Sequence, residues 1–406
     1  MVLHPLKTVG SPPRRARLSR IFWCHPMLMD YRVGLFQRMA ERYEILFFFQ
    51  QKSELANPFD SVYSRDNVIR LDNVPREDRE QIRRGVLWAD VFVSSFVWSP
   101  YTQSGLLFAK LFGRKVIVWE EIGDQILFEV RRRDPRYGWK GFVRARFGPE
   151  DPQAWPRFKK VAKFRLLARF VDAFFVQGES QAEALARLGV SPRRIFRSNE
   201  YPGQDYGDVA PHPIPLPVEE SLPVLLYLGR LIEIKGIDYL IRAFARLAAE
   251  RPGLALLIVG DGPERQTLEL LARSLGLSSV HFLGAVTDVH QKSFLFRRAA
   301  AVVVPSITIH GAREGGPLVV LEALSAGAPV VGTEVLGSST PFIQDGVNGW
   351  VVPEKDECAL SDALERLVGT DGIGRESVLR SFAEIQGHDH QADQLSRAVA
   401  SVTGRT

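Results

Sequence analysis

Two glutamates that flank a glycine pair form the part of the sequence best suited to binding and chemistry. Glu314 precedes Gly315 and Gly316, and Glu322 follows within the apolar run L-V-V-L-E-A-L. The apolar spacing and a later glycine stop predict a short buried helix with Pro317 at its first position. A helix N-terminus next to glycines offers unpaired N–H groups and a positive dipole end to an anion. The motif therefore favours a phosphate site, with Glu322 within reach of a sugar hydroxyl.

A buried strand must lead into this loop. The preceding run A-A-A-V-V-V-P-S is typical of a parallel strand covered on both faces. Open α/β sheets bind ligands at the carboxyl ends of their strands, where the loop of Glu314 would begin. The alternative for this motif is a helix packed on a sheet, with two solvated glutamates.

Two cations follow a second predicted strand. Arg230 and Lys235 lie in Y-L-G-R-L-I-E-I-K-G, after the apolar run V-L-L-Y-L. Cations on such a loop neutralise a diphosphate, which matters most when diphosphate leaves, because catalysis rewards contacts to charge that grows in the transition state. The alternative is a pair of surface cations at a strand end.

The glutamate motif, continued by A-L-S-A-G-A-P-V-V, resembles the donor-binding motif of retaining glycosyltransferases with the GT-B fold, family 4 (glycosyl transferases group 1). Order and spacing match the family across about 130 residues of the second half. The resemblance implies transfer of a hexose-type sugar from a nucleotide diphosphate sugar to a hydroxyl of a saccharide or lipid-linked acceptor, in polysaccharide or glycoconjugate synthesis. The anomeric configuration would be retained, without a covalent enzyme intermediate.

The resemblance also implies individual roles. Glu314 would contact the transferred sugar, Arg230 and Lys235 would hold the diphosphate, and Glu322 would bind the ribose. The run G-D-G-P-E-R suggests dinucleotide binding, but Pro263 after its second glycine excludes that reading. The positions expected to bind the donor nucleotide and diphosphate are Gly229, Arg230, Lys235, Gly262, Gly284, Val286, Gly316, Leu318, Val319 and Glu322.

The first half departs from the family pattern after the predicted strand K-V-I-V-W-E-E. Many members carry a histidine there, close to the reacting sugar, whereas this chain has Glu120 and Glu121. We assign Glu121 to the catalytic group, where it would orient the donor sugar or the acceptor hydroxyl; the alternative is a damaged site. The acceptor candidates are His25, Tyr31, Arg32 and His310, although packed or solvated histidines are the alternative for His25 and His310.

Strands alternate with helices in both halves, which predicts an α/β protein with two Rossmann-like, doubly wound domains facing across a cleft. The expected segments are a basic disordered leader (1–18), an N-terminal acceptor domain (19–205), a Pro-rich linker (206–223), a C-terminal donor domain (224–375) and a C-terminal helix packing back toward the N-terminal domain (376–406). A length of 406 residues suits two domains.

The composition points to the cytoplasm. Only Cys24 and Cys358 are present, and no apolar run has signal-peptide or membrane-span length. The run H-D-H-Q-A-D (388–393) resembles a metal cluster, but a solvated helix face is the preferred interpretation. No Asp-x-Asp motif occurs. We therefore expect no metal and no cofactor, with the nucleotide sugar as substrate.

Positive charge is concentrated between residues 131 and 170, where thirteen Lys or Arg accompany three acids and several aromatic residues. This segment suits an anionic acceptor or peripheral contact with the inner face of an anionic membrane. A solvated insertion is the alternative. Because no nucleic-acid recognition motif accompanies it, we expect no nucleic-acid partner.

Two other functions use the same expected fold. A nucleotide-sugar hydrolase or epimerase would need no acceptor, and a non-catalytic GT-B protein would bind a nucleotide or a partner. The sequence does not specify the base, sugar, acceptor or linkage.

Overall fold

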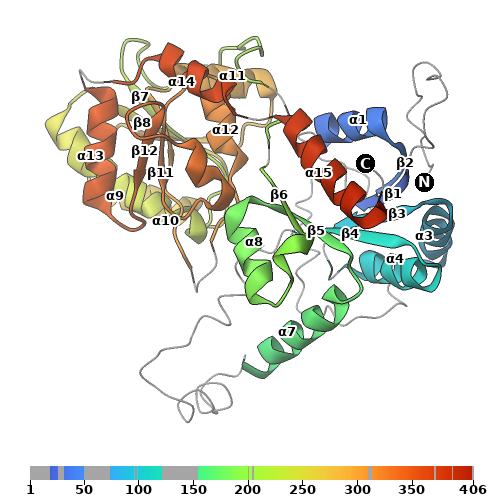
Figure 1. Ribbon diagram of the computed structural model, residues 1–406. Coiled ribbons are helices and arrows are strands. Elements are labelled where there is room, and N and C mark those ends of the chain that lie inside the picture. The colour runs from blue at the N-terminus through green and yellow to red at the C-terminus, as the bar shows by residue number, and fades with distance from the viewer. Residues whose placement is uncertain are drawn as a thin grey trace. The chain divides into compact units, whose positions relative to one another are not determined.

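The computed structural model describes residues 19–25, 32–49, 74–95, 97, 99–120, 154–199, 201–203, 205–309, 313–369, 372–385 and 387–404. The chain divides into two compact units (Figure 1). Unit 1 comprises Met1–Asn199 and Gly387–Thr406, and unit 2 comprises Glu200–Gln386. Each unit is built on a six-stranded sheet.

The sheet of unit 1 is parallel, with strand order β2-β1-β3-β4-β5-β6. The strands β3 and β5 are buried along their whole length, as is β1 after Arg20, which explains their largely apolar sequences. The strands are β1 (Arg20–His25), β2 (Glu44–Phe49), β3 (Val91–Ser95), β4 (Lys115–Glu120), β5 (Ala173–Gln177) and β6 (Ile195–Ser198).

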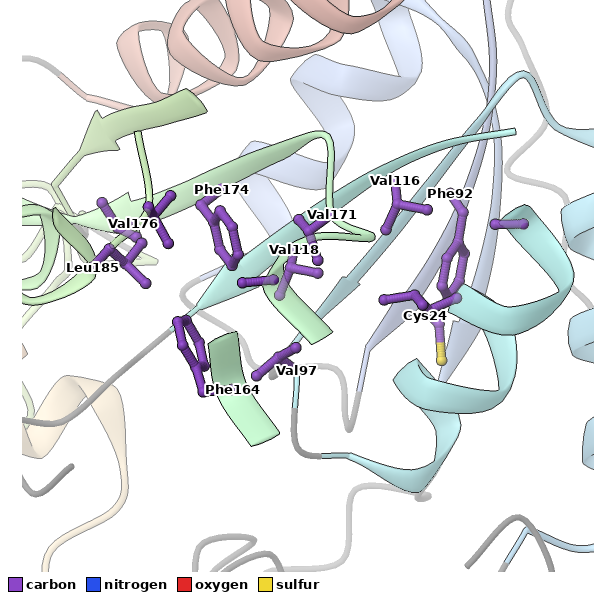
Figure 2. Close-up of a cluster of buried hydrophobic side chains, with 14 of the residues drawn as sticks. Cys24, Phe92, Val97, Val116, Val118, Phe164, Val171, Phe174, Val176 and Leu185 are labelled. Atoms are coloured by element: carbon purple, nitrogen blue, oxygen red, sulfur yellow. The ribbon is translucent and has the colours of Figure 1, made fainter. Parts of the chain in front are cut away.

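Helices cover both faces of this sheet. Since successive residues of each strand point to opposite faces, each strand contributes side chains to two cores. Phe22 and Cys24 of β1 join one core with residues of α3, α4, α7 and α8. Figure 2 shows Cys24 in this core with Phe164 of α7 and Leu185 of α8. Ile21 and Trp23 join the other core with residues of α1 and α15. The helices of unit 1 are α1 (Val33–Arg42), α3 (Arg76–Trp88), α4 (Pro100–Leu111), α7 (Ala154–Ala168), α8 (Gly178–Arg187), the 3₁₀ turn η4 (Pro192–Arg194) and α15 (His388–Thr403).

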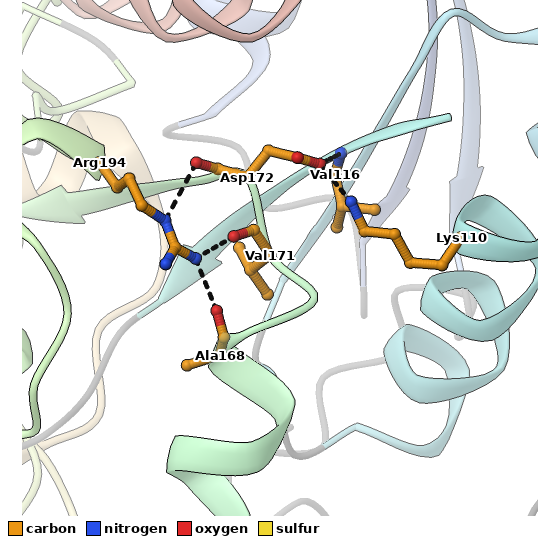
Figure 3. Close-up of polar contacts among 6 residues, drawn as sticks. All are labelled: Lys110, Val116, Ala168, Val171, Asp172 and Arg194. Atoms are coloured by element: carbon orange, nitrogen blue, oxygen red, sulfur yellow. Dashed lines mark hydrogen bonds and ion pairs between the residues drawn. The ribbon is translucent and has the colours of Figure 1, made fainter. Parts of the chain in front are cut away.

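A polar network ties α4, α7 and β5 together at the amino edge of the sheet (Figure 3). One carboxylate oxygen of Asp172 accepts the ammonium of Lys110 at 2.5 Å and the N–H of Val116 at 2.7 Å. Arg194 donates to the carbonyls of Ala168 (2.6 Å), Val171 and Asp172 (3.3 Å). The arginine thereby joins the last residue of α7 to the two residues that precede β5.

We predict that Arg194→Met destabilises unit 1 by roughly 1–3 kcal/mol, because half-buried carbonyls lose their donor. Trp23 and Trp119 are buried in unit 1, so denaturant unfolding followed by tryptophan fluorescence measures the effect. The control is Arg193→Met, which changes an exposed neighbour. Equal unfolding midpoints for the two variants would contradict the assigned role.

The sheet of unit 2 is also parallel, with strand order β12-β11-β10-β7-β8-β9. The order reverses between β7 and β10, so the loops that follow these two strands diverge at a topological switch point. The strands are β7 (Val224–Leu228), β8 (Ala255–Val259), β9 (Val280–Gly284), β10 (Ala301–Val304), β11 (Val330–Thr333) and β12 (Gly349–Val352).

Two further cores cover the faces of this sheet, one with α9, α10 and α13 and the other with α11, α12 and α14. The α/β class and the two Rossmann-like units agree with the prediction. The helices of unit 2 are η5 (Glu233–Lys235), α9 (Ile237–Glu250), α10 (Arg265–Ser274), α11 (Val289–Arg298), α12 (Leu318–Ser325), η6 (Gly337–Phe342), α13 (Glu357–Val368) and α14 (Arg375–Ala383).

The segments between the predicted domains belong to definite units. The Pro-rich stretch 206–223 lies in unit 2, where Arg298 donates to the carbonyl of Leu222 at 2.6 Å. The C-terminal segment 376–406 is divided, with α14 in unit 2 and α15 in unit 1. Among the described residues, no helix is both long and apolar enough to cross a membrane.

Candidate functional site

The loop after β7 is held by backbone contacts with the loop after β8. The N–H of Gly229 donates to the carbonyl of Val259, and that of Leu231 donates to Asp261, both at 2.9 Å. Gly260 has φ +148°, and a Cβ added there would lie 1.8 Å from the carbonyl oxygen of Gly229. Only glycine allows this approach. The run G-D-G-P-E-R thus supports the loop that carries Arg230 and Lys235.

Lys235 and Glu314 meet at the switch point. The ammonium of Lys235, in η5, forms an ion pair with the Glu314 carboxylate, and the hydroxyl of Ser306 donates to the other carboxylate oxygen. The two charged side chains are 17% and 13% exposed. Ser306 is buried, and its carbonyl accepts the hydroxyl of Thr333 at 2.6 Å. The pair joins the loops of neighbouring strands; the sequence predicted both residues at the carboxyl edge of the sheet, but it did not predict the ion pair between them.

Tyr227 lies beneath Arg230. Its hydroxyl donates to the carbonyl oxygen of Arg230 at 2.8 Å, which fixes the backbone at the start of the loop. Burial raises the pKa of Tyr227 well above its usual value, and the negative charge of Glu314 adds to the effect while Arg230 opposes it. The phenol therefore stays a neutral donor. The side chain of Arg230 is exposed, and it forms no ion pair with another described residue.

The loop after β10 leads into α12. The helix begins at Leu318, with Pro317 as the N-cap residue in an extended conformation. The expectation that Pro317 is the first helical residue is therefore wrong by one position, because its ψ of 117° is not helical. Val320 donates its N–H to the carbonyl of Pro317 at 3.2 Å, whereas the amides of Leu318 and Val319 have no acceptor among the described residues. These two amides are available to an anion.

The turn η6 holds this loop in place. Ser338 donates both its N–H (2.9 Å) and its hydroxyl (3.1 Å) to the carbonyl of Gly315. The hydroxyl of Ser339 donates to the carbonyl of Pro317 at 3.2 Å. Both serines are buried, so the carbonyls of the loop point into η6. A Cβ on Gly316 would lie 2.1 Å from the Ser338 hydroxyl oxygen, which leaves no room for a side chain.

Glu322 is held on α12 by two neighbours. The hydroxyl of Tyr206 donates to its Oε1 at 3.3 Å, and the ammonium of Lys292 lies 3.8 Å from the same oxygen. Burial, together with the charge and hydrogen bond of Glu322, raises the pKa of Tyr206, so the phenol remains a donor. The second carboxylate oxygen has no partner among the described residues, which suits it to accept from a hydroxyl group.

The other predicted donor positions lie along the same edge. Gly262 fits closely against the β7 loop, since a Cβ there would lie 2.3 Å from the carbonyl oxygen of Leu231. The carbonyl of Gly284 accepts the N–H of Gly260 at 2.8 Å. Val286 is half-buried and packs against the core beside α11 and α12. Backbone contact between this segment and a base stays a prediction.

In unit 1 the described acceptor candidates are His25 and Arg32. His25, the last residue of β1, is buried beside Phe36 and Trp119. Its Nε2 contacts the guanidinium of Arg32, whose carbon lies 4.5 Å from the ring centre of Trp119. Both residues are thus packed at the carboxyl edge of the unit 1 sheet. Three predicted site residues lie outside the described residues: Tyr31, Glu121 and His310.

The acidic residues of H-D-H-Q-A-D form ion pairs between α15 and α1. Asp389 pairs with Arg38 at 3.0 Å, and Asp393 pairs with Arg42 at 2.6 Å, which joins α15 to α1. Within the described parts of the chain, no group of three His, Cys, Asp or Glu side chains is arranged to hold a metal ion.

Four supporting residues were not predicted from the sequence: Tyr206, Tyr227, Ser306 and Ser338. Tyr227 lies in a strand, whereas Tyr206 and Ser338 lie in turns, and none of the three belongs to a distinctive pattern. Ser306 is the exception, because its place right after the apolar strand puts it at the ligand-binding edge.

A family model described as glycosyl transferases group 1 matches residues 212–377. The lipopolysaccharide core biosynthesis glycosyltransferase LpsE of Rhizobium meliloti is 30% identical over 284 residues, covering 68% of this chain and 77% of LpsE. The chain spans only 15% of a second relative, the exopolysaccharide phosphotransferase SCO2592 of Streptomyces coelicolor, at 36% identity over 38% of this chain.

Solved structures share the fold along most of the chain. HepE of Anabaena, in complex with UDP and glucose, superposes with a TM-score of 0.66 at 16% identity, covering 94% of this chain and 100% of HepE. The lipopolysaccharide outer core galactosyltransferase WaaB in its apo form gives 0.61 at 15% identity, covering 94% and 99%. Fold and site together define a protein of the GT-B class.

The match to LpsE extends over most of both chains, so this chain belongs to the glycosyl transferases group 1 family. The resemblance stated from the glutamate motif is thereby confirmed as far as the glycosyl transferases group 1 family, a family of glycosyltransferase enzymes.

Gly337 lies where η6 packs closely against the loop of Glu314. Gly337 has φ +58°, and a Cβ there would lie 2.4 Å from the carbonyl oxygen of Gly315. Gly346 has a similar φ, +74°, with no atom within 4 Å of an added Cβ. Both alanine variants carry the left-handed strain of about 1 kcal/mol, but only Gly337→Ala also forces the loop to move. We expect a lower thermal unfolding midpoint for Gly337→Ala than for Gly346→Ala; equal midpoints would argue against a close contact.

Proposed function

We propose that the switch point of unit 2 binds a nucleotide diphosphate sugar and that the enzyme transfers its sugar to an acceptor hydroxyl. The observation that carries this proposal is the juxtaposition of Lys235 and Glu314 with the open amides of Leu318 and Val319. Cation and amides suit the diphosphate, and the carboxylate suits sugar hydroxyls. Support for the donor class comes from HepE, whose structure holds UDP and glucose.

The proposed reaction breaks the bond between the anomeric carbon and the diphosphate oxygen. The acceptor oxygen forms the new bond on the same face, and its proton passes to a diphosphate oxygen, so configuration is retained. Lys235, Arg230 and the α12 amides stabilise the negative charge that accumulates on the leaving group. Glu314 orients the sugar hydroxyls and stabilises positive charge at the anomeric carbon, and Glu322 accepts from the ribose. Glu121 remains our proposal for orienting the sugar or acceptor in unit 1.

Donor binding must loosen the contact between Lys235 and Glu314. A diphosphate offers the ammonium more negative charge than one carboxylate does, while Ser306 still holds Glu314. Before the donor binds, the ion pair already holds the side chains of Lys235 and Glu314 in place. Less conformational entropy is then lost when the donor binds.

We predict that Lys235→Ala, Arg230→Ala and Glu314→Ala each lower sugar transfer by about 10²–10³-fold, because each removes a group that contacts developing charge. The measurement is release of nucleoside diphosphate from UDP- and GDP-sugars, with circular dichroism to check folding. Glu365→Gln, at an exposed ion pair of α13, is the control. Normal turnover in all three variants would refute the mechanism, and free sugar as the sole product would identify a hydrolase.

We propose a hexose-type sugar and a saccharide or lipid-linked acceptor. The names of relatives support a role in polysaccharide synthesis: LpsE is assigned to lipopolysaccharide core biosynthesis, and a 34% identical relative from Escherichia coli is the O-antigen chain mannosyltransferase C. Acceptors of this class are polyhydroxylated, which agrees with a reaction that needs only an accessible hydroxyl.

We further propose a cytoplasmic enzyme in peripheral contact with the anionic inner face of a membrane. Helices α4 and α7 pack on the same face of the unit 1 sheet. Residues 100–119 and 154–171, which include them, contain nine Lys or Arg and no acid. The same two stretches carry exposed apolar side chains: Leu111, Phe112, Leu166 and Phe170. Cations beside exposed apolar groups suit an anionic lipid surface.

We predict that the protein floats with phosphatidylglycerol vesicles at low salt and that Lys115→Glu/Arg169→Glu abolishes flotation, since each lysine or arginine near such a surface contributes about 1 kcal/mol. Leu270→Ser on α10 serves as the control, because Leu270 is about as exposed as Leu166 (55% against 56%) but lies beside an acid, Glu269. Equal recovery of the wild type and the charge-reversed variant would end the proposal.

A further inference from the structure

The turn between β12 and α13 contains a residue in a costly conformation. Lys355 has φ +63° and is the one non-glycine residue with positive φ among the described residues. The left-handed region crowds the Cβ of an L-residue against its own backbone, so glycine is the residue that fits there without strain. Asp356 follows as the N-cap of α13, its side chain accepting the N–H of Ala359 at 2.9 Å. The turn requires this conformation, but it does not require a lysine.

The side chains of this turn take up all three polar groups of Thr308. The carboxylate of Glu354 accepts the N–H of Thr308 through one oxygen and its hydroxyl through the other, the latter at 2.7 Å. The ammonium of Lys355 donates to the carbonyl oxygen of Thr308 at 2.9 Å. Two consecutive residues thus grip one residue of another loop through three hydrogen bonds. Both side chains are charged, which makes these bonds stronger than neutral ones.

Thr308 belongs to the loop that supports the Lys235–Glu314 pair. Ser306, two residues earlier, donates its hydroxyl to Glu314. Ile307, between them, donates its N–H to the carbonyl of Ile234 at 2.8 Å, next to Lys235. The segment 306–308 therefore contacts Glu314 directly and the residue that precedes Lys235, and Thr308 is the point at which it is fastened to the turn before α13.

We propose that Glu354 and Lys355 form a latch on Thr308 that holds segment 306–308 and so sets the placement of Glu314 relative to Lys235. In this account both are positioning residues for the donor diphosphate. The ammonium of Lys355 explains why a lysine occupies a position that favours glycine. The consequence for donor binding rests on the proposed function, whereas the latch itself does not.

Lys355→Gly separates the latch from ordinary stabilisation. Glycine removes the ammonium but also removes the left-handed strain, so a residue with only a local structural role would be replaced without loss. Lys355→Arg restores a cationic donor at the same backbone conformation. Glu354→Gln keeps the shape of the side chain while weakening two of the three bonds, and it provides a second test should the turn variants fold poorly. Glu365→Gln is the matched control on α13.

The test combines hydrogen exchange of the peptide containing 306–308, thermal unfolding, and calorimetric titration with UDP and with GDP. For Lys355→Gly we expect exchange and the dissociation constant of the bound nucleotide to rise about tenfold, as for a modest misplacement of binding groups. The unfolding midpoint should stay equal or rise. Lys355→Arg and Glu365→Gln should behave as wild type, and Glu354→Gln should resemble Lys355→Gly.

Wild-type exchange and affinity in both Lys355→Gly and Glu354→Gln would overturn the latch. Faster exchange with unchanged nucleotide affinity would overturn its positioning role. A wild-type protein that binds neither UDP nor GDP would count against the proposed function, and hydrogen exchange alone would then decide whether the latch exists.

Discussion

The ion pair between Lys235 and Glu314 is the interaction on which the candidate site depends. It exists because β7 and β10 are neighbours in a parallel sheet and release their loops at the same edge. Opposite charges at such low exposure are costly unless they are well matched, and Ser306 supplies a further hydrogen bond. The loops after β7 and β10 are thereby fixed against each other. Ser338 and Ser339 of η6 donate to the carbonyls of Gly315 and Pro317. The amides at the start of α12 are then left for an anion.

Much of this arrangement follows from the sequence. Continuous apolar runs identify buried parallel strands, and the carboxyl ends of such strands share an edge, so Arg230, Lys235 and Glu314 were expected there. The glutamate motif also carried the family resemblance. The strands β6 and β12 were not predicted, because β6 ends in the polar residues Arg197 and Ser198, and β12 has only three apolar residues after Gly349.

What the sequence could not provide are side-chain contacts between distant segments. Tyr206 reaches Glu322 across 116 positions and Glu354 reaches Thr308 across 46. No periodicity encodes such pairs, because each depends on where two loops meet after the sheet has formed. The error at Pro317 has a different origin. Proline fits both the N-cap and the first turn of a helix, so residue type alone does not place the helix start.

The order in which the two units are synthesised affects how the chain folds on the ribosome. Unit 2 is continuous in sequence, whereas unit 1 takes α15 from the far end of the chain. One face of the unit 1 sheet is covered by Ala392, Leu395, Ala398 and Val399 together with α1. During synthesis, the apolar residues of that face stay partly exposed to solvent until α15 has left the ribosome. Unit 1 of the nascent chain should therefore need chaperones until α15 has been synthesised, although most of its residues precede unit 2.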